Sequence, residues 1–224
     1  MAEARHDRSK MHYQLDRISF FSDGVFAIAI TLLIIEFKVP VLENPSDALL
    51  WNSLSHMSLQ FLGFLISFAI VGYYWSVHHR IFGYVDDYNT RLIWLNLFFL
   101  FSVVLLPFSS GLLGEYSSET ELHIPYGVYV LNILLVATMN GILWLYVSEP
   151  KRKLLTHQIS PERIRLGLYF TFVVPSFFIL SYLVSLWLPV VGRLIPAVIP
   201  VFLKYGLKGL ARRAMQQEEA RRSS

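Results

Sequence analysis

The chain has 224 residues, of which 54% are hydrophobic and only 16% are charged. Soluble domains usually carry about 25% charged residues, so this composition indicates a chain that contacts lipid, and it excludes intrinsic disorder. There is no cysteine, which excludes a disulfide framework, a thiolate zinc site and a cysteine nucleophile. The net charge of +3 is compatible with nucleic-acid binding, but the distribution of the charges along the chain argues against it.

The apolar residues are concentrated in runs that are long enough to cross a bilayer. Four runs contain no Asp, Glu, Lys or Arg, and these are 57–77, 92–114, 124–148 and 166–192. About 20 helical residues span a hydrocarbon core of about 30 Å, and each run reaches that length. Two further stretches are nearly as apolar. Residues 18–35 contain only Asp23, and residues 194–210 contain Lys204 and Lys208, close enough to one end to reach the interface.

The sequence therefore predicts an all-α integral membrane protein with six transmembrane helices and no soluble domain. Residues 1–14 are predicted to form a polar cytoplasmic arm, and residues 214–224 a polar cytoplasmic tail. The predicted transmembrane helices cover about 15–37, 54–78, 91–113, 125–148, 161–188 and 193–213. Ser160 followed by Pro161 is typical of a helix start, and Pro196 and Pro200 predict a kink in the last helix.

The basic residues are distributed unevenly between the two sides of this arrangement. Of the 19 Lys and Arg residues, only Lys38 and Arg193 fall on the side opposite the termini. The positive-inside rule therefore places both termini in the cytoplasm. Because topology and contact with anionic headgroups account for the basic residues, we expect no nucleic-acid partner. The other side is acidic and would concentrate cations, although the exclusion of basic residues from outer loops produces the same pattern.

Asp23 is an acidic residue that lies well inside a predicted span, one to two turns from its cytoplasmic end. A charge within the bilayer costs about 3 kcal/mol on insertion scales, so it normally faces protein or water and has a partner. Candidate partners at the same membrane level are Arg17, His78, His79 and Asn96. The cluster is interpreted either as a polar lock between the first three helices or as a proton or ion site.

The first helix also carries a stripe of residues at helical spacing. The members of this stripe are Gly24, Ile28, Thr31, Leu32 and Ile35. Asp23 lies about 140° from Ile28 around the helix axis, so it does not share the stripe. A mostly apolar stripe with one hydroxyl group is typical of helix packing or lipid contact, and the pattern by itself does not indicate a pore.

The sequence resembles a known protein family at two points. Residues 17–24, read as Arg17-Ile18-Ser19-Phe20-Phe21-Ser22-Asp23-Gly24, fit the pattern Arg-x-x-x-Phe-Ser-Asp followed by a small residue, and residues 74–82 match a further segment. The first pattern is similar to the first-helix signature of the transmembrane protein 175 family, the endosomal and lysosomal potassium channels and their prokaryotic relatives. Six predicted spans and one signature per chain resemble the prokaryotic members, which implies a prokaryotic plasma membrane.

The resemblance implies a homotetrameric, potassium-selective, leak-like cation channel in which four copies of the first helix line a central pore. Carried onto this chain, the family's hydrophobic constriction falls at Ile28, followed on the same face by Leu32 and Ile35, and Thr31 is the implied selectivity residue. The signature and its polar support would comprise Arg17, Phe21, Ser22, Asp23, Gly24, His78, His79 and Asn96. Permeant K⁺ is expected, and no cofactor or metal site is expected.

Other classes of function are weighed against the channel. A proton-linked secondary transporter could use Asp23 with His78 or His79, but the chain shows no inverted repeat and no paired broken helices. A membrane-embedded enzyme would need paired intramembrane carboxylates, a His-Glu-x-x-His motif or a Gly-x-Ser-x-Gly motif, and none occurs. We therefore expect no enzymatic activity, and a membrane-bound scaffold stays open as an alternative.

Overall fold

The computed structural model describes residues 2–119, 121–155, 159–199 and 202. Within these ranges the chain is helical and has no strand, and an isolated antiparallel bridge pairs Val85 with Leu155. The prediction of an all-α protein is therefore confirmed for this part of the chain. The long helices are α1 (Ala2–Ile35), α3 (Ser58–Phe82), α4 (Thr90–Glu115), α5 (His123–Ser148) and α6 (Pro161–Ser185). The short elements are α2 (Asp47–His56), η1 (Pro150–Arg152), α7 (Pro189–Leu194) and η2 (Ile195–Val198).

Five segments of the described chain are long and apolar enough to cross a membrane, and these are Tyr13–Ile35 and the helices α3, α4, α5 and α6. The predicted sixth span, 193–213, lies mostly outside the described residues. Its described part is interrupted, because α7 ends at Leu194 and a 3₁₀ turn over Ile195–Val198 follows. Pro196 lies in that turn, where its missing N–H leaves the helical ladder broken, and Pro200 lies outside the described residues. The count of six helices is therefore not confirmed.

The structure differs from two predicted helix boundaries near the N-terminus. The α1 helix begins at Ala2, so the backbone of the predicted polar arm is helical. The predicted helix over 54–78 is divided at Met57, whose N–H bonds to the carbonyl of Leu54, a 3₁₀-type bond that interrupts the α-helical ladder. The α3 helix then starts at Ser58 and continues to Phe82, four residues beyond the predicted end.

Side-chain caps fix the start of two long helices at the same end of the bundle. Asn89 accepts a hydrogen bond from the backbone N–H of Leu92 at 2.9 Å and begins α4. Ser160 accepts from the N–H of Arg163 at 3.3 Å and begins α6, with Pro161 in the first turn. The predicted helix start at Ser160 and Pro161 is thereby confirmed.

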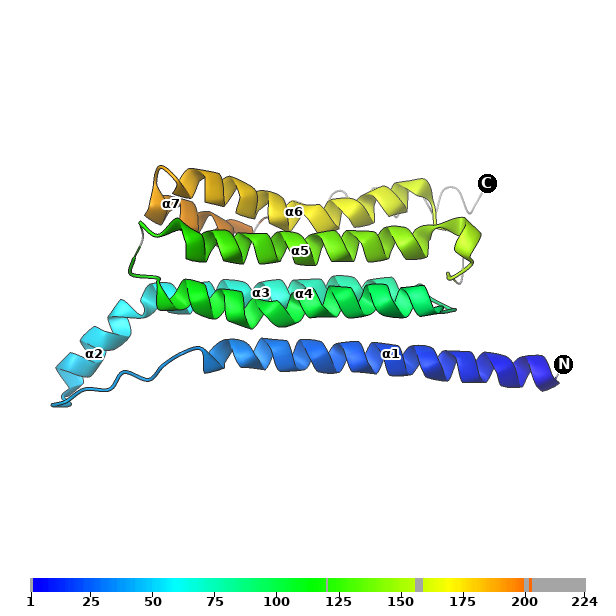
Figure 1. Cartoon of the computed structure of the whole chain (residues 1–224), viewed down its shortest axis with the longest axis horizontal. Coiled ribbons are helices and arrows are strands. Elements are labelled where there is room, and N and C mark those ends of the chain that lie inside the picture. Colours follow the sequence, from blue (N-terminus) through cyan, green and yellow to red (C-terminus); the bar gives the residue numbers. More distant parts are fainter. Residues whose placement is uncertain (1, 120, 156–158, 200–201, 203–224) are drawn as a thin grey trace.

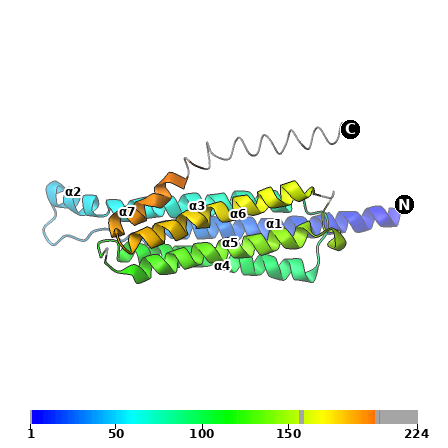
Figure 2. The ribbon, with the colours of Figure 1, turned by 90° about the horizontal axis from the view of Figure 1, so that it is seen from above.

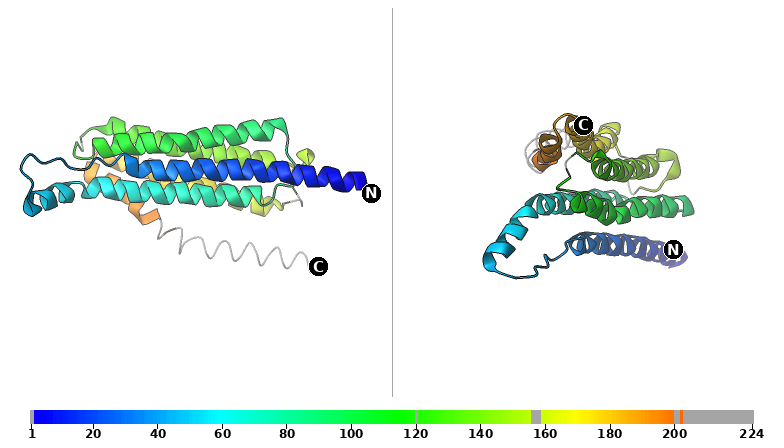
Figure 3. Two further views of the ribbon diagram at one scale, coloured as in Figure 1. Left: turned by 90° about the horizontal axis from the view of Figure 1, so that it is seen from below. Right: turned by 60° about the vertical axis from the view of Figure 1, so that its left-hand side comes forward.

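The long helices are arranged in three layers (Figures 1 and 3). The α1 helix packs on α3 and α4, which pack on each other, and α4 packs on α5, which packs on α6. Figure 2 shows α2 and α7 together at one end of the bundle, and the N-terminus at the other. We call these the α2 end and the N-terminal end. Among the residues that the structure describes, α1 is an outer layer with neighbours on one side only.

A tyrosine of α3 compensates for a proline inside α6. Pro175 has no N–H, so the carbonyl of Thr171, one turn earlier, lacks its helical donor. The Tyr74 hydroxyl donates to this carbonyl at 3.3 Å, and the Tyr73 hydroxyl donates to the carbonyl of Phe170. Tyr74 is fully buried. The Tyr74 bond satisfies a carbonyl that lacks its helical donor and has no access to water in a bilayer, and both bonds join α3 to α6.

A similar polar contact joins α4 to α5 close to Pro107. Asn132 of α5 donates from Nδ2 to the carbonyl of Ser102 at 2.9 Å, and its Oδ1 accepts from the Ser109 hydroxyl at 2.8 Å. All three side chains are buried. The Asn132 amide therefore bonds to one residue before and one residue after Pro107. Its own buried N–H and oxygen both find partners, which the apolar side chains around them could not supply.

The Tyr74 bond gives a first testable prediction. Tyr74→Phe should lower the free energy of unfolding in detergent by about 1 kcal/mol, because the Thr171 carbonyl is left without a donor. In a Pro175→Ala background the same substitution should cost less, because the alanine supplies a backbone N–H to that carbonyl. Chemical unfolding of the wild type, the two single variants and the double variant measures the difference between the two costs. An equal cost in both backgrounds would show that Tyr74 does not compensate for the proline.

Candidate functional site

One face of α1 is fixed against the bundle. Its buried residues are Leu15, Ser22, Phe26, Ala29 and Leu33, which recur at helical spacing. These side chains face α3 and α4, the two helices that α1 contacts. The rotation of α1 about its own axis is therefore set by a continuous buried stripe.

The predicted stripe lies on the other side of the same helix. Ile28 is two residues from Phe26, which places it about 200° around the axis. The exposed fraction is 61% for Ile28 and 69% for Ile35, and 37% for Leu32, which lies at the edge of the stripe. Gly24 and Thr31 are also exposed. All five predicted residues are therefore together on the face of α1 that no other part of the described chain covers.

The Thr31 hydroxyl is held by its own helix. Its Oγ1 donates to the carbonyl of Ala27 at 3.0 Å and to that of Ile28 at 2.9 Å. Because the hydroxyl proton is shared between these two acceptors, the lone pairs of Oγ1 stay available on the exposed face of α1. Thr31 therefore presents an oxygen acceptor between the apolar side chains of the stripe.

A buried hydrogen-bonded chain ties α1 to α3 and α4. His78 Nε2 lies 2.8 Å from Asn96 Oδ1, and Asn96 Nδ2 donates to the Ser22 hydroxyl at 2.9 Å. The Ser22 hydroxyl donates in turn to the carbonyl of Ile18 at 2.8 Å. An amide oxygen only accepts, so His78 donates from Nε2 and the three bonds run in one direction, from His78 to the carbonyl of Ile18. The structure thus brings together three of the predicted residues: Ser22, His78 and Asn96.

Asp23 has a different partner from those predicted. The indole Nε1 of Trp75 donates to Asp23 Oδ1 at 2.8 Å. Trp75 stacks on His79, with ring centroids 5.7 Å apart and an interplanar angle of 29°. His79 is therefore linked to Asp23 through the tryptophan, while Asn96 bonds to the neighbouring Ser22. The carboxylate is half-buried and lies beside the buried chain.

The remaining signature residues lie outside this cluster. Arg17 is exposed and donates from Nη1 to Gln14 Oε1 at 3.3 Å, within α1 itself. Phe21 is exposed, and Gly24 has open space where a Cβ would be. The described chain therefore does not bring Arg17 to Asp23, and Phe21 and Gly24 belong to the uncovered side of α1.

Trp75 is the residue of this cluster that sequence reasoning missed. A tryptophan within an apolar span carries one N–H donor, and such a donor usually finds an acceptor. Asp23 is the acidic residue inside the facing span, so this donor was a signal that could have identified the pair. The candidate partners were chosen by membrane level, and Trp75 was not among them, whereas in the structure its indole N–H is the donor to Asp23.

At the α2 end, an ion pair joins the end of α1 to α4. Lys38 Nζ lies 2.9 Å and 3.0 Å from the two carboxylate oxygens of Glu115. The hydrogen bond to Glu115 raises the pKa of Lys38 above its ordinary value. One turn away, Glu36 packs over Gly111, where a Cβ would lie 2.4 Å from Oε2. Gly111 therefore makes room for the last turn of α1 against α4.

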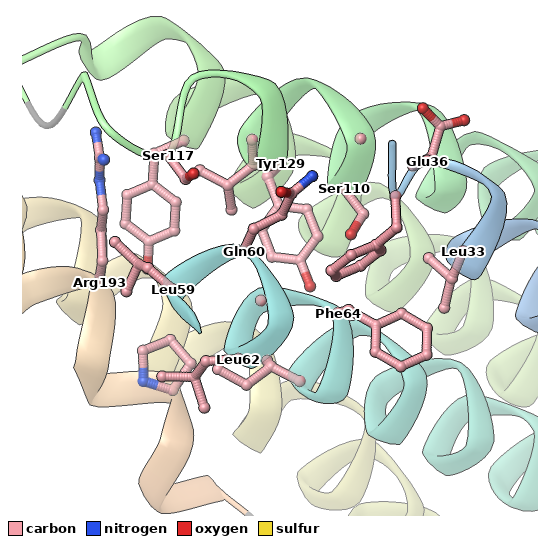
Figure 4. A pocket seen from close by; sticks show the side chains of 18 of the residues that line it. Leu33, Glu36, Leu59, Gln60, Leu62, Phe64, Ser110, Ser117, Tyr129 and Arg193 are labelled. Carbon is pink, nitrogen blue, oxygen red and sulfur yellow. The ribbon is translucent and has the colours of Figure 1, made fainter. Parts of the chain in front are cut away.

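A cavity opens beside this junction, and Figure 4 shows Glu36 and Arg193 at its opposite ends. Its wall includes Leu33, on the buried face of α1. The hydroxyls of Tyr129 and Ser110, which also line it, are each 2.8 Å from the Ser67 hydroxyl and bond to that residue. The cavity therefore lies on the opposite side of α1 from the exposed stripe.

Comparison with known proteins identifies relatives that cover most of the chain. Residues 17–107 match the family of the endosomal/lysosomal potassium channel TMEM175. A potassium channel of Chamaesiphon minutus is 35% identical over 182 residues, which are 78% of this chain and 87% of that protein. A potassium channel of Streptomyces collinus is 37% identical over 134 residues, which are 59% of this chain and 64% of that protein.

A solved structure gives the same result for the fold. The crystal structure of a lysosomal potassium-selective channel TMEM175 homolog from Chamaesiphon minutus aligns with a TM-score of 0.70 at 28% identity, covering 86% of this chain and 99% of that one. The family match includes the signature of α1, the whole of α3 and α4 as far as Pro107, and α1 packs on these two helices. The chain belongs to the TMEM175 family.

Proposed function

We propose that this chain forms a potassium-selective, leak-like cation channel, as a homotetramer in which four copies of α1 surround a central pore. The observation that carries the proposal is the uncovered face of α1, where Ile28, Thr31, Leu32 and Ile35 are exposed in the single chain. A chain that supplies one such face needs several copies around an axis to enclose a pore. The names of the two bacterial relatives, both potassium channels, support this function.

In this channel Ile28 forms the constriction. Four isoleucine side chains around the axis make a narrow apolar ring, which blocks ions by excluding water when its diameter is small. Leu32 and Ile35 continue the apolar lining toward the α2 end, one and two turns further along α1. The gate is then hydrophobic and requires no titratable group at its narrowest point.

Thr31 supplies the selectivity. Its oxygen presents lone pairs on the exposed face, because the hydroxyl proton is bonded within the helix. Four such oxygens replace part of the hydration shell of a K⁺ ion. Because hydroxyl groups and trapped water are less rigid than stacked backbone carbonyls, we expect modest discrimination between K⁺ and Na⁺. This mechanism uses permeant ions and no resident cofactor.

The polar cluster at the N-terminal end positions the pore helix. Ser22 and Asn96 fix the rotation of α1, and the Trp75–Asp23 bond adds a second tie to α3. These residues are positioning residues, since none of them belongs to the stripe. In a prokaryotic plasma membrane, the excess of basic residues places the N-terminal end and both termini on the cytoplasmic side.

The alternative is a proton-linked secondary transporter, which would couple Asp23 to His78. In the described chain Asp23 accepts from Trp75, and His78 donates to Asn96, so the two groups have separate partners. Recording from single protein complexes in liposomes separates the two functions. Unitary currents that reverse near the potassium equilibrium potential support the channel, whereas slow, saturating and stoichiometric flux would support the transporter.

Ile28→Ala tests the constriction. Removing the branched side chain widens and wets the ring, so we expect leak current and unitary conductance to rise several-fold. Ile34→Ala is the matched control, because Ile34 is also exposed on α1 but lies about 120° from Ile28. Single-channel recording of both variants measures the effect. Unchanged currents in Ile28→Ala, or equal changes in both variants, would refute the pore assignment.

Thr31→Val tests the selectivity residue, because valine keeps the shape of threonine and removes the oxygen. We expect the K⁺/Na⁺ permeability ratio, measured from reversal potentials under bi-ionic conditions, to fall toward one. Thr31→Ser retains the hydroxyl and should preserve most of the ratio. If valine and serine leave the ratio equally unchanged, the hydroxyl has no part in selectivity.

Trp75→Phe tests the positioning of the pore helix. The variant removes the donor to Asp23, a hydrogen bond to a charged group worth about 1.5–3 kcal/mol, so open probability or tetramer stability should fall. The reversal potential should not change, because neither residue lies on the stripe. Asp23→Ala should have the same effect, and the double variant should be no worse than either single one. Trp94→Phe, at an exposed tryptophan of α4, is the control. A shifted reversal potential would place Asp23 in the ion path.

A further inference from the structure

A second cavity lies at the N-terminal end of the bundle, between α3, α5 and α6. Its apolar and aromatic wall consists of Val77, Ile81, Tyr84, Trp144, Leu166 and Phe170. The cavity has a volume of about 230 Å³ and opens to the surface. Ligand pockets commonly have volumes of about 300–1,000 Å³, so this cavity is smaller than most and holds one part of a ligand, whose remainder extends through the open mouth.

Two arginines line this cavity, one from α3 and one from α6. Arg80 belongs to the last turn of α3, and its Cζ lies 5.6 Å from the centre of the Phe170 ring. Arg163 belongs to the first turn of α6, and its Cζ lies 5.7 Å from the centre of the Tyr84 ring. The other residues that line the cavity are uncharged. The lining therefore carries two positive charges and, among the described residues, no negative one.

The cavity is basic near the end of the bundle and apolar further in. Along α6 its lining extends from Arg163 to Thr171, which corresponds to a depth of about 12 Å. The polar groups deeper in the wall already have partners. Trp144 Nε1 donates to the carbonyl of Ile164 at 3.0 Å, and the Thr171 hydroxyl donates to the carbonyl of Gly167 at 3.0 Å. A ligand therefore meets charge at the mouth and hydrocarbon below it.

We propose that this cavity binds one anionic phospholipid of the inner leaflet. The phosphate lies between Arg80 and Arg163, where guanidinium groups form charge-assisted hydrogen bonds to its oxygens. One acyl chain follows the apolar wall past Val77 and Phe170. Basic pockets between transmembrane helices on the cytoplasmic side have the chemistry that anionic headgroups require. A free phosphate ion would leave the apolar part of the cavity unfilled, so the site fits a lipid and not a soluble anion.

The test uses the full-length protein in mild detergent and measures lipid binding by native mass spectrometry. The probes are dioleoyl-phosphatidylglycerol, dioleoyl-phosphatidylcholine and chainless glycerol phosphate. Wild-type protein should bind phosphatidylglycerol in preference to the other two. The Arg80→Gln/Arg163→Gln double variant should bind it about thirtyfold more weakly, since each basic side chain contributes about 1 kcal/mol to binding an anionic lipid.

Arg165→Gln is the matched control, because Arg165 is an exposed arginine of the same helix turn that does not line the cavity. This variant should keep the wild-type affinity for phosphatidylglycerol. If the double variant does not fold, Arg80→Gln alone should weaken binding by about fivefold on the same scale. The proposal is overturned by equal binding of the two phospholipids, by an unchanged affinity in the Arg80 variants, by an equal loss in Arg165→Gln, or by competition from glycerol phosphate at the same site. None of these readouts depends on ion currents.

Discussion

Asn96 holds three helices together with one amide group. It accepts from His78 of α3 and donates to Ser22 of α1, while its own backbone belongs to α4. In the hydrocarbon region no water replaces such bonds, so separating α1 from its neighbours would leave polar groups without hydrogen-bond partners. The bond to Ser22 also fixes which side of α1 faces inward. A turn of the helix by one residue, about 100°, would move Ile28 off the exposed face.

The same need to satisfy buried polar groups explains how the rest of the bundle is joined. Asn132 ties α5 to α4 around Pro107, and Tyr74 ties α3 to α6 opposite Pro175. These contacts connect the second and third layers, so four helices form a body with polar ties on several sides. The α1 helix, in contrast, is tied to this body along one face (Figure 3). Its uncovered face is the surface that an oligomer of the proposed kind would enclose.

Features that depend on composition along the chain were predicted correctly from the sequence. Contacts that depend on how two neighbouring helices are rotated toward each other were not. Charge-free runs located four of the five helices that are long and apolar enough to span a membrane, and the Ser160-Pro161 pair located the start of α6. The break at Met57 depends on one local 3₁₀ bond, which the apolar pattern does not encode. The partner of Asp23 depends on how α1 and α3 face each other. Periodicity defines the faces of each helix but not their pairing, so Trp75 was missed while Ser22, His78 and Asn96 were expected to be near one another.

Two kinds of contact hold the stripe in place, and together they constrain how the proposed channel opens. Toward the N-terminal end α1 is fixed by Asn96, and at the α2 end by the Lys38–Glu115 ion pair, while the segment between is held by apolar packing. Isoleucine is branched at Cβ and keeps essentially one χ1 rotamer in a helix, so the aperture of an Ile28 ring follows the position of the backbone. Widening the ring therefore requires α1 to bend between its two anchors or to release one of them. Releasing Asn96 costs the most, because it leaves a buried amide unsatisfied. Bending shifts non-directional apolar contacts, and the Lys38–Glu115 pair is largely exposed and contributes little, so the ring would widen by bending or by release at the α2 end.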